Sequence, residues 1–410
     1  MYKPNGCANS NKEGGTMGCS QGTTFMGFRR HSRRPGVRNL PVVFPLDASL
    51  SRLAELGSTN TGAVRVPVHD ALSYLRSPFT LRVVADFLSN PNVGHVVLVA
   101  STSSRDVAEA ITGDLRRLDV PTETLYAEDC SSVAGFIQSI HDACAGATAG
   151  CATVDRISFP VSELLVGTEC GGSDGYSGLS ANPVVGKVVD RLVSEGGAAL
   201  LCELPEAIGA EHLLAQRAID AETANRVTGA VLAWESLAAR FGEDLRGAQP
   251  SPGNQDGGLT TIEEKSLGAI AKGGSTPLVE VVDYGQAPSR AGLIVMDTPG
   301  HDVEQMTGMA AAGAQIILFT TGRGTPTGSP VVPTLKIGTN PSVSQHLSSL
   351  IDFDASTVLS GESLDDAGAA LFRLMLKTAS GTPSLAERAS QFDFALPPLG
   401  SSKLLSGSAR

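Results

Sequence analysis

Aromatic side chains and long apolar runs are both scarce in this chain of 410 residues. Phe, Trp and Tyr make up 5% of it, with a single Trp, which argues against a surface that stacks on single-stranded nucleic acid. The net charge is −11, so the chain also lacks the positive charge that binding to a phosphate backbone requires. No run of about 18 apolar residues occurs, so we expect no membrane-spanning helix. These absences argue against nucleic acid and membranes as partners.

The chain also lacks the signs of a secreted or zinc-ribbon protein. Its seven cysteines show no zinc-ribbon spacing. The first residues have no apolar core and therefore do not form a secretory signal, and we expect residues 1–24 to be a disordered polar tail. An odd number of cysteines without a signal favours a reduced protein, so we expect a cytoplasmic location.

Short apolar, β-branched runs alternate with stretches of helical spacing along most of the chain. LPVVFP (40–45) and VGHVVLVA (93–100) are typical of strands, and SPFTLRVVADFLSN (77–90) between them has helical spacing. This alternation predicts an α/β fold made of Rossmann-like domains, each a parallel sheet with helices on both faces. Residues 209–241 are expected to form one long helix.

Two domains are predicted from this pattern. The first covers 25–155, the second covers 156–392, and residues 393–410 are expected to be a polar tail. A Pro- and Gly-rich loop at 247–266 is too long for a simple connection, and loops of that length inside a compact domain are usually functional.

Four predicted strands in the second half end in polar turns. These turns are CGGSD (170–174), CELPE (202–206), DTPGHD (297–302) and TTGRGTP (320–326). Because the carboxyl ends of parallel strands meet at one edge of a sheet, we expect one pocket that holds a thiol, carboxylates, a histidine and an arginine. Neither a P-loop nor a G-x-G-x-x-G after the first strand is present, so a nucleotide site is not predicted.

Glycines in these turns favour close approach of a ligand to the main chain. Gly171 and Gly172 precede a predicted helix, whose N-terminus favours an anion. Arg323 lies between two glycines and can make a bidentate contact with a carboxylate or a phosphate.

The same residue types also have structural interpretations, which the pattern alone leaves open. Cys170 fits either a ligand or a small buried side chain. Glu203 and Glu206 fit either proton transfer or the capping of backbone donors at a strand end. His301 follows a glycine in a loop, which favours function. Lys265, in EEK, fits a solvated helix start, although the long loop before it favours a role in the site.

These turns resemble those of the D-galactarate/altronate dehydratase family. ELPEAIGAEHLLAQRA (203–218) and PSPGNQDGGLTTIEEKSLG (250–268) extend the resemblance in the same order. The first domain matches more loosely, through GFRRHSRRPGVRN (27–39). The resemblance covers roughly 25–390, without the small N-terminal SAF-type domain that is fused in some members. A separate small SAF-domain subunit is therefore an expected partner.

The resemblance implies a hydro-lyase, usually linked to Fe²⁺. Such an enzyme removes water from a sugar acid and leaves a 2-keto-3-deoxy acid. A base takes the proton α to the carboxylate, a metal or cationic group stabilises the enediolate, and an acid assists departure of the β-hydroxyl.

The motifs and the resemblance together give a set of candidate residues. The sequence does not decide which of them is the base and which bind the metal. The catalytic candidates are Glu203, Glu206, His301 and Lys265; the metal candidates are Cys170 and His69; the substrate-binding candidates are Arg38, Asn39, Gly171, Gly172, Ser173, Asp174, Thr320, Thr321, Arg323 and Thr325.

Several cysteines that the resemblance implies are replaced in this chain. Leu72-Ser73 and Gly328-Ser329 stand where Gly-Cys is expected, Ser103 lies near another such position, and Ala269 stands where cysteine is frequent. A hydroxyl is a poor substitute for a thiolate toward soft or borderline metals. The hypothesis is therefore a changed or absent metal site, with Fe²⁺, another divalent cation or no metal as the cofactor.

Two further functions remain open at this point. One is a sulfolactate sulfo-lyase, whose large subunit resembles the same family. The other is a non-catalytic paralogue that binds a sugar acid without turning it over. We also expect a homo-oligomer.

Overall fold

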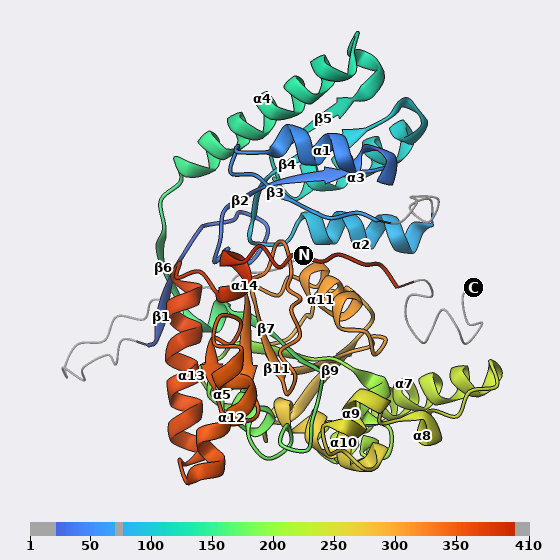
Figure 1. The fold of residues 1–410 in the computed structure, drawn as a ribbon, viewed down its shortest axis with the longest axis vertical. Helices are drawn as coiled ribbons and strands as arrows, with labels where there is room; N and C mark the ends of the chain where they lie inside the picture. Colours follow the sequence, from blue (N-terminus) through green and yellow to red (C-terminus); the bar gives the residue numbers. More distant parts are fainter. Residues whose placement is uncertain (1–21, 70–76, 398–410) are drawn as a thin grey trace, which may run out of the picture.

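The computed structural model describes residues 22–69 and 77–397, which form two parallel-sheet units joined by a short antiparallel ribbon (Figure 1). The ribbon pairs β1 (Thr24–Gly27) with β6 (Ile157–Pro160). The predicted α/β class, with Rossmann-like parallel sheets and helices packed around them, is confirmed.

The first unit has a four-stranded parallel sheet in the order β3-β2-β4-β5. Its strands are β2 (Leu40–Pro45), β3 (Val64–Arg65), β4 (Val93–Ala100) and β5 (Thr122–Tyr126). Its helices are α1 (Ser51–Ser58), α2 (Pro78–Leu88), α3 (Arg105–Arg117) and α4 (Val133–Ala152). Ser77 begins α2 by accepting a hydrogen bond from the Thr80 N–H, directly before Pro78, a residue suited to the first helical position.

The second unit has a seven-stranded parallel sheet in the order β13-β12-β11-β7-β8-β10-β9. Its strands are β7 (Leu165–Gly171), β8 (Ala198–Leu201), β9 (Leu278–Val282), β10 (Gly292–Met296), β11 (Ile316–Thr321), β12 (Thr334–Gly338) and β13 (Phe353–Asp354). The chain leaves β7 toward β8 and later returns to β11 on the other side of β7. This reversal creates a crevice at the carboxyl end of β7, where α/β proteins bind ligands.

Ten helices of the described chain belong to the second unit. They are α5 (Ala181–Ser194), α6 (Glu211–Gln216), α7 (Ala221–Arg240), α8 (Leu245–Ala248), α9 (Pro252–Asp256), α10 (Ile262–Ile270), α11 (Asp302–Ala311), α12 (Pro341–His346), α13 (Leu364–Ala379) and α14 (Leu385–Arg388). The single long helix predicted over 209–241 is instead two helices, because Asp220 caps a new start by accepting a hydrogen bond from the Thr223 N–H.

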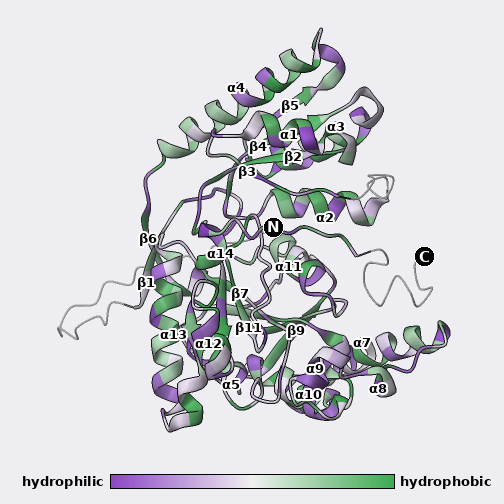
Figure 2. Cartoon of the chain, in the orientation of Figure 1, coloured by the Kyte–Doolittle hydropathy of each residue, from purple (hydrophilic) through white to green (hydrophobic). Residues whose placement is uncertain are grey.

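The two faces of the larger sheet are covered differently. Helices α5 and α13 cover one face and share its apolar core. Helix α11 covers the other face, and α2 of the first unit packs on α11, so one apolar core continues through both units. Figure 2 shows the strands as mostly hydrophobic and the helices as mixed, as expected for elements with one buried side.

The residues after α14 join this shared core. Of the predicted tail at 393–410, the structure describes 393–397, and the Asp393 N–H donates to the Gly328 carbonyl. Phe394 is buried between Phe44 of β2 and Phe87 of α2, with ring centroids 5.6 and 4.9 Å away.

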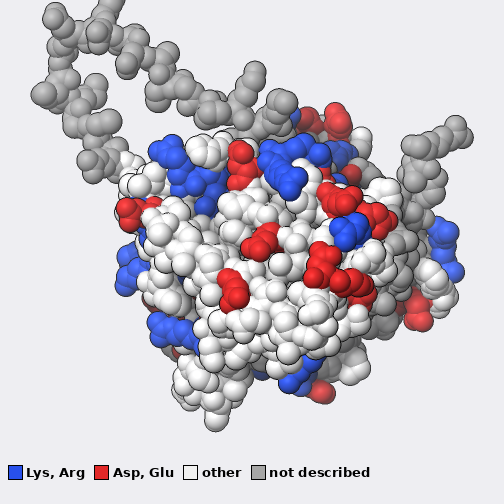
Figure 3. Space-filling view, turned by 90° about the horizontal axis from the view of Figure 1, so that it is seen from above, with Lys and Arg blue, Asp and Glu red and all other residues white. Residues whose placement is uncertain are grey.

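Two features bear on the absence of membrane and nucleic-acid partners that the sequence predicts. None of these helices combines the length and the apolar character needed to cross a bilayer. On the face shown in Figure 3, groups of Lys and Arg lie beside groups of Asp and Glu with wide uncharged areas between them. This face therefore lacks the continuous positive stripe of a nucleic-acid binder.

Phe394→Ala is expected to lower the free energy of unfolding by about 3 kcal/mol, because it removes a buried ring and leaves a cavity. Phe241→Ala is the matched control, since Phe241 is 71% exposed, and a change within about 0.5 kcal/mol is expected there. Urea unfolding followed by circular dichroism measures both. Equal effects would show that the segment after α14 does not stabilise the shared core.

Candidate active site

Cys170 and Glu203 lie side by side at the carboxyl ends of neighbouring strands, Cys170 in β7 and Glu203 just after β8. The Cys170 N–H donates to Glu203 Oε1 over 3.0 Å. Glu203 has a left-handed backbone, with φ of 69°, which is uncommon for a residue with a Cβ. Its own N–H donates to Thr298 Oγ1 over 2.9 Å. These two bonds hold a strained turn in place at the strand ends.

Lys272 supplies an ammonium group between these two side chains. It lies in a short 3₁₀ turn, Ala271–Gly273, that follows α10, and it is fully buried. Its Nζ donates to Cys170 Sγ over 2.7 Å and also contacts Glu203 Oε2. Both oxygens of Glu203 are thus used, one by the Cys170 backbone and the other by Lys272.

Glu206 and Lys265 complete the group, which we call the strand-end cluster: Cys170, Glu203, Glu206, Lys265 and Lys272. Glu206 Oε2 lies 3.6 Å from Cys170 Sγ, and Glu206 Oε1 lies 2.9 Å from Lys265 Nζ. Lys265 also donates to Gln249 Oε1 in the long loop. The Glu206 side chain is 13% exposed, whereas that of Glu203 is 1% exposed, so Glu206 is the carboxylate that a ligand can approach.

Burial and charge together set the protonation of the cluster. Burial raises the pKa of Glu203, and the Lys272 ammonium opposes this shift. Burial also raises the pKa of the Cys170 thiol, and the charge of Glu203 adds to the effect. Burial lowers the pKa of Lys272, but the negative groups around it outweigh burial, so its pKa lies above the usual value. At neutral pH, Cys170 is therefore a thiol and Lys272 an ammonium.

Three members of the cluster suit a metal ion by donor type. Cys170 Sγ and carboxylate oxygens of Glu203 and Glu206 all lie within 4.8 Å of one another. One sulfur and two carboxylate oxygens are ligands that Fe²⁺ or Zn²⁺ accepts. Lys265 and Lys272 already balance the charge of the two carboxylates. Lys272 also contacts Cys170 Sγ and Glu203 Oε2, two of the atoms that would bind a metal. A cation at this place therefore competes with Lys272.

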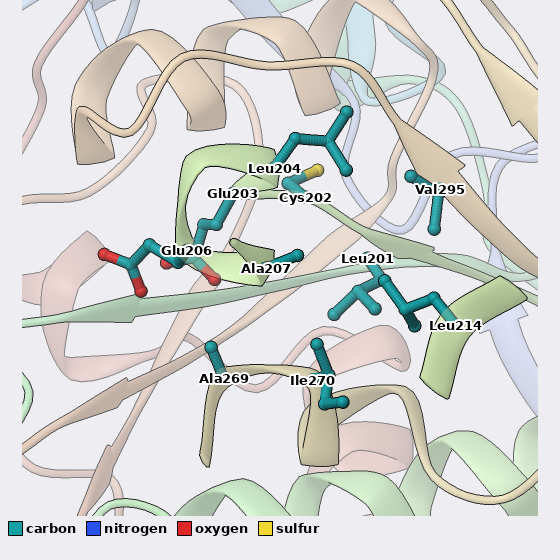
Figure 4. Close-up of a pocket in the computed structure, with 10 residues that line it drawn as sticks. All are labelled: Leu201, Cys202, Glu203, Leu204, Glu206, Ala207, Leu214, Ala269, Ile270 and Val295. Carbon is teal, nitrogen blue, oxygen red and sulfur yellow. The ribbon is translucent and has the colours of Figure 1, made fainter. Parts of the chain in front are cut away.

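A pocket of about 260 Å³ opens beside the cluster. Cys170 and Lys265 line it together with Ser173 and Asn182. Figure 4 shows a second, much smaller pocket, with Glu203, Glu206 and Ala269 toward one end and Leu214 and Val295 toward the other. Ala269 lines both pockets, so one of the replaced cysteine positions lies at this site.

The other replaced positions lie elsewhere or outside the described residues. Ser329 Oγ lies 3.4 Å from the Val331 nitrogen and accepts its hydrogen bond, in the loop after β11. Ser103 lies in the first unit, 2.7 Å from Ser101 between their hydroxyl oxygens. Leu72-Ser73 falls outside the described residues.

Several predicted substrate-binding residues form the rim of the crevice. Gly172 has φ of 61°, a conformation that favours glycine, and its Cα lies next to the Arg323 side chain. Arg323 is exposed. Thr321 Oγ1 accepts hydrogen bonds from the N–H groups of Gly324 and Thr325, which shapes the turn that carries Arg323.

Other predicted substrate-binding residues make internal contacts. Asp174 accepts hydrogen bonds from Ser177 Oγ, Thr339 Oγ1 and Asn340 Nδ2. Thr320 Oγ1 is 2.6 Å from Asn182 Oδ1. These contacts tie the turn after β7 to the residues that follow β12, and α5 to β11.

The structure does not bring every candidate to the cluster. Arg38 forms a bidentate ion pair with Glu387 of α14, which ties it to the second unit, and the Asn39 amide donates to the Cys151 carbonyl of α4 within the first unit. His69 is exposed after β3 and is not among the metal-donor group found in the described residues. His301 is exposed directly before α11.

Sequence reasoning missed Lys272 of the strand-end cluster, and it did not single out Asp302, Glu169 and Lys336, three further charged residues of the second unit. Lys272 precedes two glycines after a helix, and Asp302 is the last residue of a turn that was identified as functional. Glu169 and Lys336 are single charges inside otherwise apolar strands, and a charge in such a position is the signal that was available.

Comparison with known proteins links this site to one family. A family model described as D-galactarate/Altronate dehydratase, C-terminal, matches residues 161–401, the part that contains the whole strand-end cluster. The chain is 33% identical to an altronate dehydratase of Bacillus subtilis, over 82% of this chain and 69% of that protein. It is 35% identical to the galactarate dehydratase (L-threo-forming) of Escherichia coli, over 73% of this chain and 59% of that protein.

A third relative matches over nearly its whole length. The chain is 33% identical to the (2R)-sulfolactate sulfo-lyase subunit beta of Chromohalobacter salexigens, over 92% of this chain and 98% of that protein. With a family model that matches more than half of the sequence and dehydratase relatives above 30% identity, the chain belongs to the D-galactarate/altronate dehydratase family.

Proposed function

We propose that this chain is a hydro-lyase that dehydrates a sugar acid of the altronate or galactarate type to a 2-keto-3-deoxy acid. The observation that carries the proposal is the strand-end cluster beside a pocket of about 260 Å³. The elimination requires a base, an acid and a positive charge near the developing enediolate. Two carboxylates, a thiol and two ammonium groups supply these chemical types within one small volume.

Within the cluster we assign the base to Glu206. Glu203 has both oxygens engaged and is almost fully buried, so its role is to position Cys170 and Lys272. Glu206 is less buried, and Lys265 holds one of its oxygens while lining the pocket. In this assignment Glu206 takes the proton α to the carboxylate, and the Lys265 ammonium stabilises the enediolate. His301, exposed at the start of α11, suits exchange of protons with solvent.

Arg323 and the turn after β7 are proposed to bind the substrate carboxylate. Arg323 is exposed at the rim beside Gly172, where its guanidinium can form two parallel hydrogen bonds to a carboxylate. The missing Cβ at Gly172 lets the Arg323 side chain pack close to the main chain, whereas the space beside Gly171 is filled by Asp302 Oδ2 and the Phe319 ring. The hydroxyl groups of the substrate would face Ser173 and Asn182 in the pocket wall.

A divalent cation, Fe²⁺ or another, would be held by Cys170 Sγ and one carboxylate oxygen each of Glu203 and Glu206, which would leave the Glu206 oxygen beside Lys265 for proton transfer. Such an ion would withdraw negative charge from the enediolate as it forms. The replaced cysteines remove soft donors around this triad, Ala269 among them, and this supports a site of altered metal preference.

The sulfo-lyase alternative is favoured by the match in length, since the chain aligns with 98% of the sulfo-lyase subunit. Elimination of sulfite from sulfolactate uses the same steps, because the proton is again α to a carboxylate and the leaving group is again at the β carbon. The same match supports the proposal of a separate small subunit as a partner, within a larger oligomer.

Anaerobic incubation of the protein with altronate, galactarate and sulfolactate, with and without Fe²⁺, tests the proposal. We expect mass spectrometry to detect loss of water from a sugar acid. Glu206→Gln should lower kcat/KM by about 100-fold or more, since a positioned base contributes that much. Glu362→Gln is the control, because Glu362 is exposed in the turn directly before α13, and this variant should retain activity.

Two outcomes would contradict the dehydratase proposal. Release of sulfite without loss of water would support the sulfo-lyase. Binding of a sugar acid with no turnover by folded, metal-loaded protein would support a non-catalytic binder.

Lys272→Met is expected to tighten binding of a divalent cation. The substitution frees Cys170 Sγ and Glu203 Oε2 and removes a positive charge from the site. Affinity for Zn²⁺ should rise at least about tenfold, because a charge at this distance inside a protein is worth more than about 1.4 kcal/mol. Anaerobic calorimetry and the rise of the unfolding midpoint with Zn²⁺ measure this.

Lys377→Met, at an exposed position of α13, is the control for the loss of one positive charge. If both variants bind Zn²⁺ equally well, Lys272 does not compete with the metal.

A further inference from the structure

The face of the sheet that points away from the pocket carries a row of buried side chains on three adjacent strands. Phe319 of β11 pairs in register with Glu169 of β7 on one side and with Lys336 of β12 on the other. Glu169 and Phe319 are completely buried, and Lys336 is 1% exposed. Helix α11 covers this face. Two charged residues therefore lie in an apolar layer.

The polar atoms of this row have no hydrogen-bond partner within the described part of the chain. These atoms are Lys336 Nζ, both carboxylate oxygens of Glu169 and, from α11, Gln305 Nε2. Lys336 Nζ lies 3.3 Å from the centre of the Phe319 ring. Buried polar groups are nearly always paired, and exceptions often have a role in chemistry. The packing of the sheet alone does not account for Lys336.

Asp302 connects this row to the active site. It is the first residue of α11, and its Oδ2 lies against Gly171 so closely that a Cβ at Gly171 would overlap it. The charges that act on Asp302 are Glu206 of the strand-end cluster, Lys336 of the row and His301. Asp302 is partly exposed, whereas Lys336 is 1% exposed and cannot touch a substrate.

The surroundings of Lys336 and Asp302 lower the pKa of the lysine and raise the pKa of the aspartate. Burial lowers the pKa of Lys336 to about 7, and Asp302 opposes this shift more than the other facing carboxylates, which are Glu169, Asp352 and Asp393. Burial raises the pKa of Asp302, and the charge of Glu206 adds to this, while Lys336 opposes it. Groups whose environments shift their proton affinities in this way are typical of acid–base sites.

We propose that Asp302 is the acid of the elimination and that Lys336 is a positioning residue that acts through it. This inference rests on the proposed lyase function. The carboxyl proton of Asp302 passes to the β-hydroxyl, the C–O bond breaks with its electron pair on oxygen, and water leaves. The new Asp302 carboxylate is stabilised by the Lys336 ammonium. The proton that Glu206 has taken from the α carbon returns to Asp302 through solvent or His301, and the enol product becomes the 2-keto acid.

Three variants test the proposal: Asp302→Asn, Lys336→Met and, as the control, Lys377→Met. The kinetic parameters kcat and KM are measured from pH 5.5 to 9.5, with whichever acid the wild type turns over. Asp302→Asn should lower kcat by about 100-fold with little change in KM, as expected for loss of a general acid. Wild-type kcat should fall at high pH, where Asp302 loses its carboxyl proton. Lys336→Met removes a charge that lowers the pKa of Asp302, so it should move that limb to higher pH, and Lys377→Met should leave it in place.

A second measurement needs no substrate. Equilibrium unfolding of the wild type and of Lys336→Met is compared between pH 6 and 10. The folded state of the wild type binds fewer protons at Lys336 than the unfolded state from pH of about 7 to about 10.4, so the stability of the wild type relative to Lys336→Met should rise with pH across this window. Asp302→Asn removes a carboxylate that holds the proton on Lys336, so the rise should begin at lower pH.

The outcomes separate this inference from the proposed function. Wild-type turnover with an unchanged kcat in Asp302→Asn would overturn the inference and leave the lyase intact. A pH limb at the same pH in Lys336→Met as in the wild type, or a stability difference that is constant with pH, would overturn the role of Lys336. No turnover of any acid by the wild type would overturn both proposals.

Discussion

The buried Lys272 ammonium is the group on which the geometry of the active site depends. It lies between a thiol and a carboxylate at the ends of two neighbouring strands, where water does not reach it. A buried charge without a partner is strongly destabilising, so Lys272 requires Glu203 and Glu203 requires Lys272. The pair fixes the left-handed turn at Glu203, and that turn places Glu206 beside the pocket. Stability and chemical function thus share one set of contacts.

The larger sheet carries polar groups on both of its faces at the same strand ends. The strand-end cluster lies on the side of α5 and α10, and the Glu169–Phe319–Lys336 row lies on the side of α11. The first unit packs on α11 through α2, which seals the second face from water. None of the strand-end cluster comes from the first unit, which instead packs on the helix that covers the Glu169–Phe319–Lys336 row.

Much of this arrangement could be predicted from the sequence. The alternation of apolar strands and helices predicted the α/β class. The polar turns after the strands correctly indicated that Cys170, Glu203 and Glu206 meet. The break after α6 was missed because its helical spacing continues, while the Asp220 cap that starts α7 is a local signal. Glu169 and Lys336 were missed because each is one charge in an apolar strand, and only the register of three strands brings them together. Arg38 was a candidate for substrate binding because its ion-pair partner, Glu387, lies far away in the sequence, and only the folded structure shows that the two side chains meet.

A double-mutant cycle between Glu203 and Lys272 tests the central claim most directly. The free energy of unfolding is measured for Glu203→Gln, Lys272→Met and the variant that carries both. Each single variant leaves one buried charge unpaired and should lose about 3–5 kcal/mol, and the double variant should lose clearly less than the sum of the two. Losses that simply add would show that the two residues stabilise the fold independently, and that the site is not built around this ion pair.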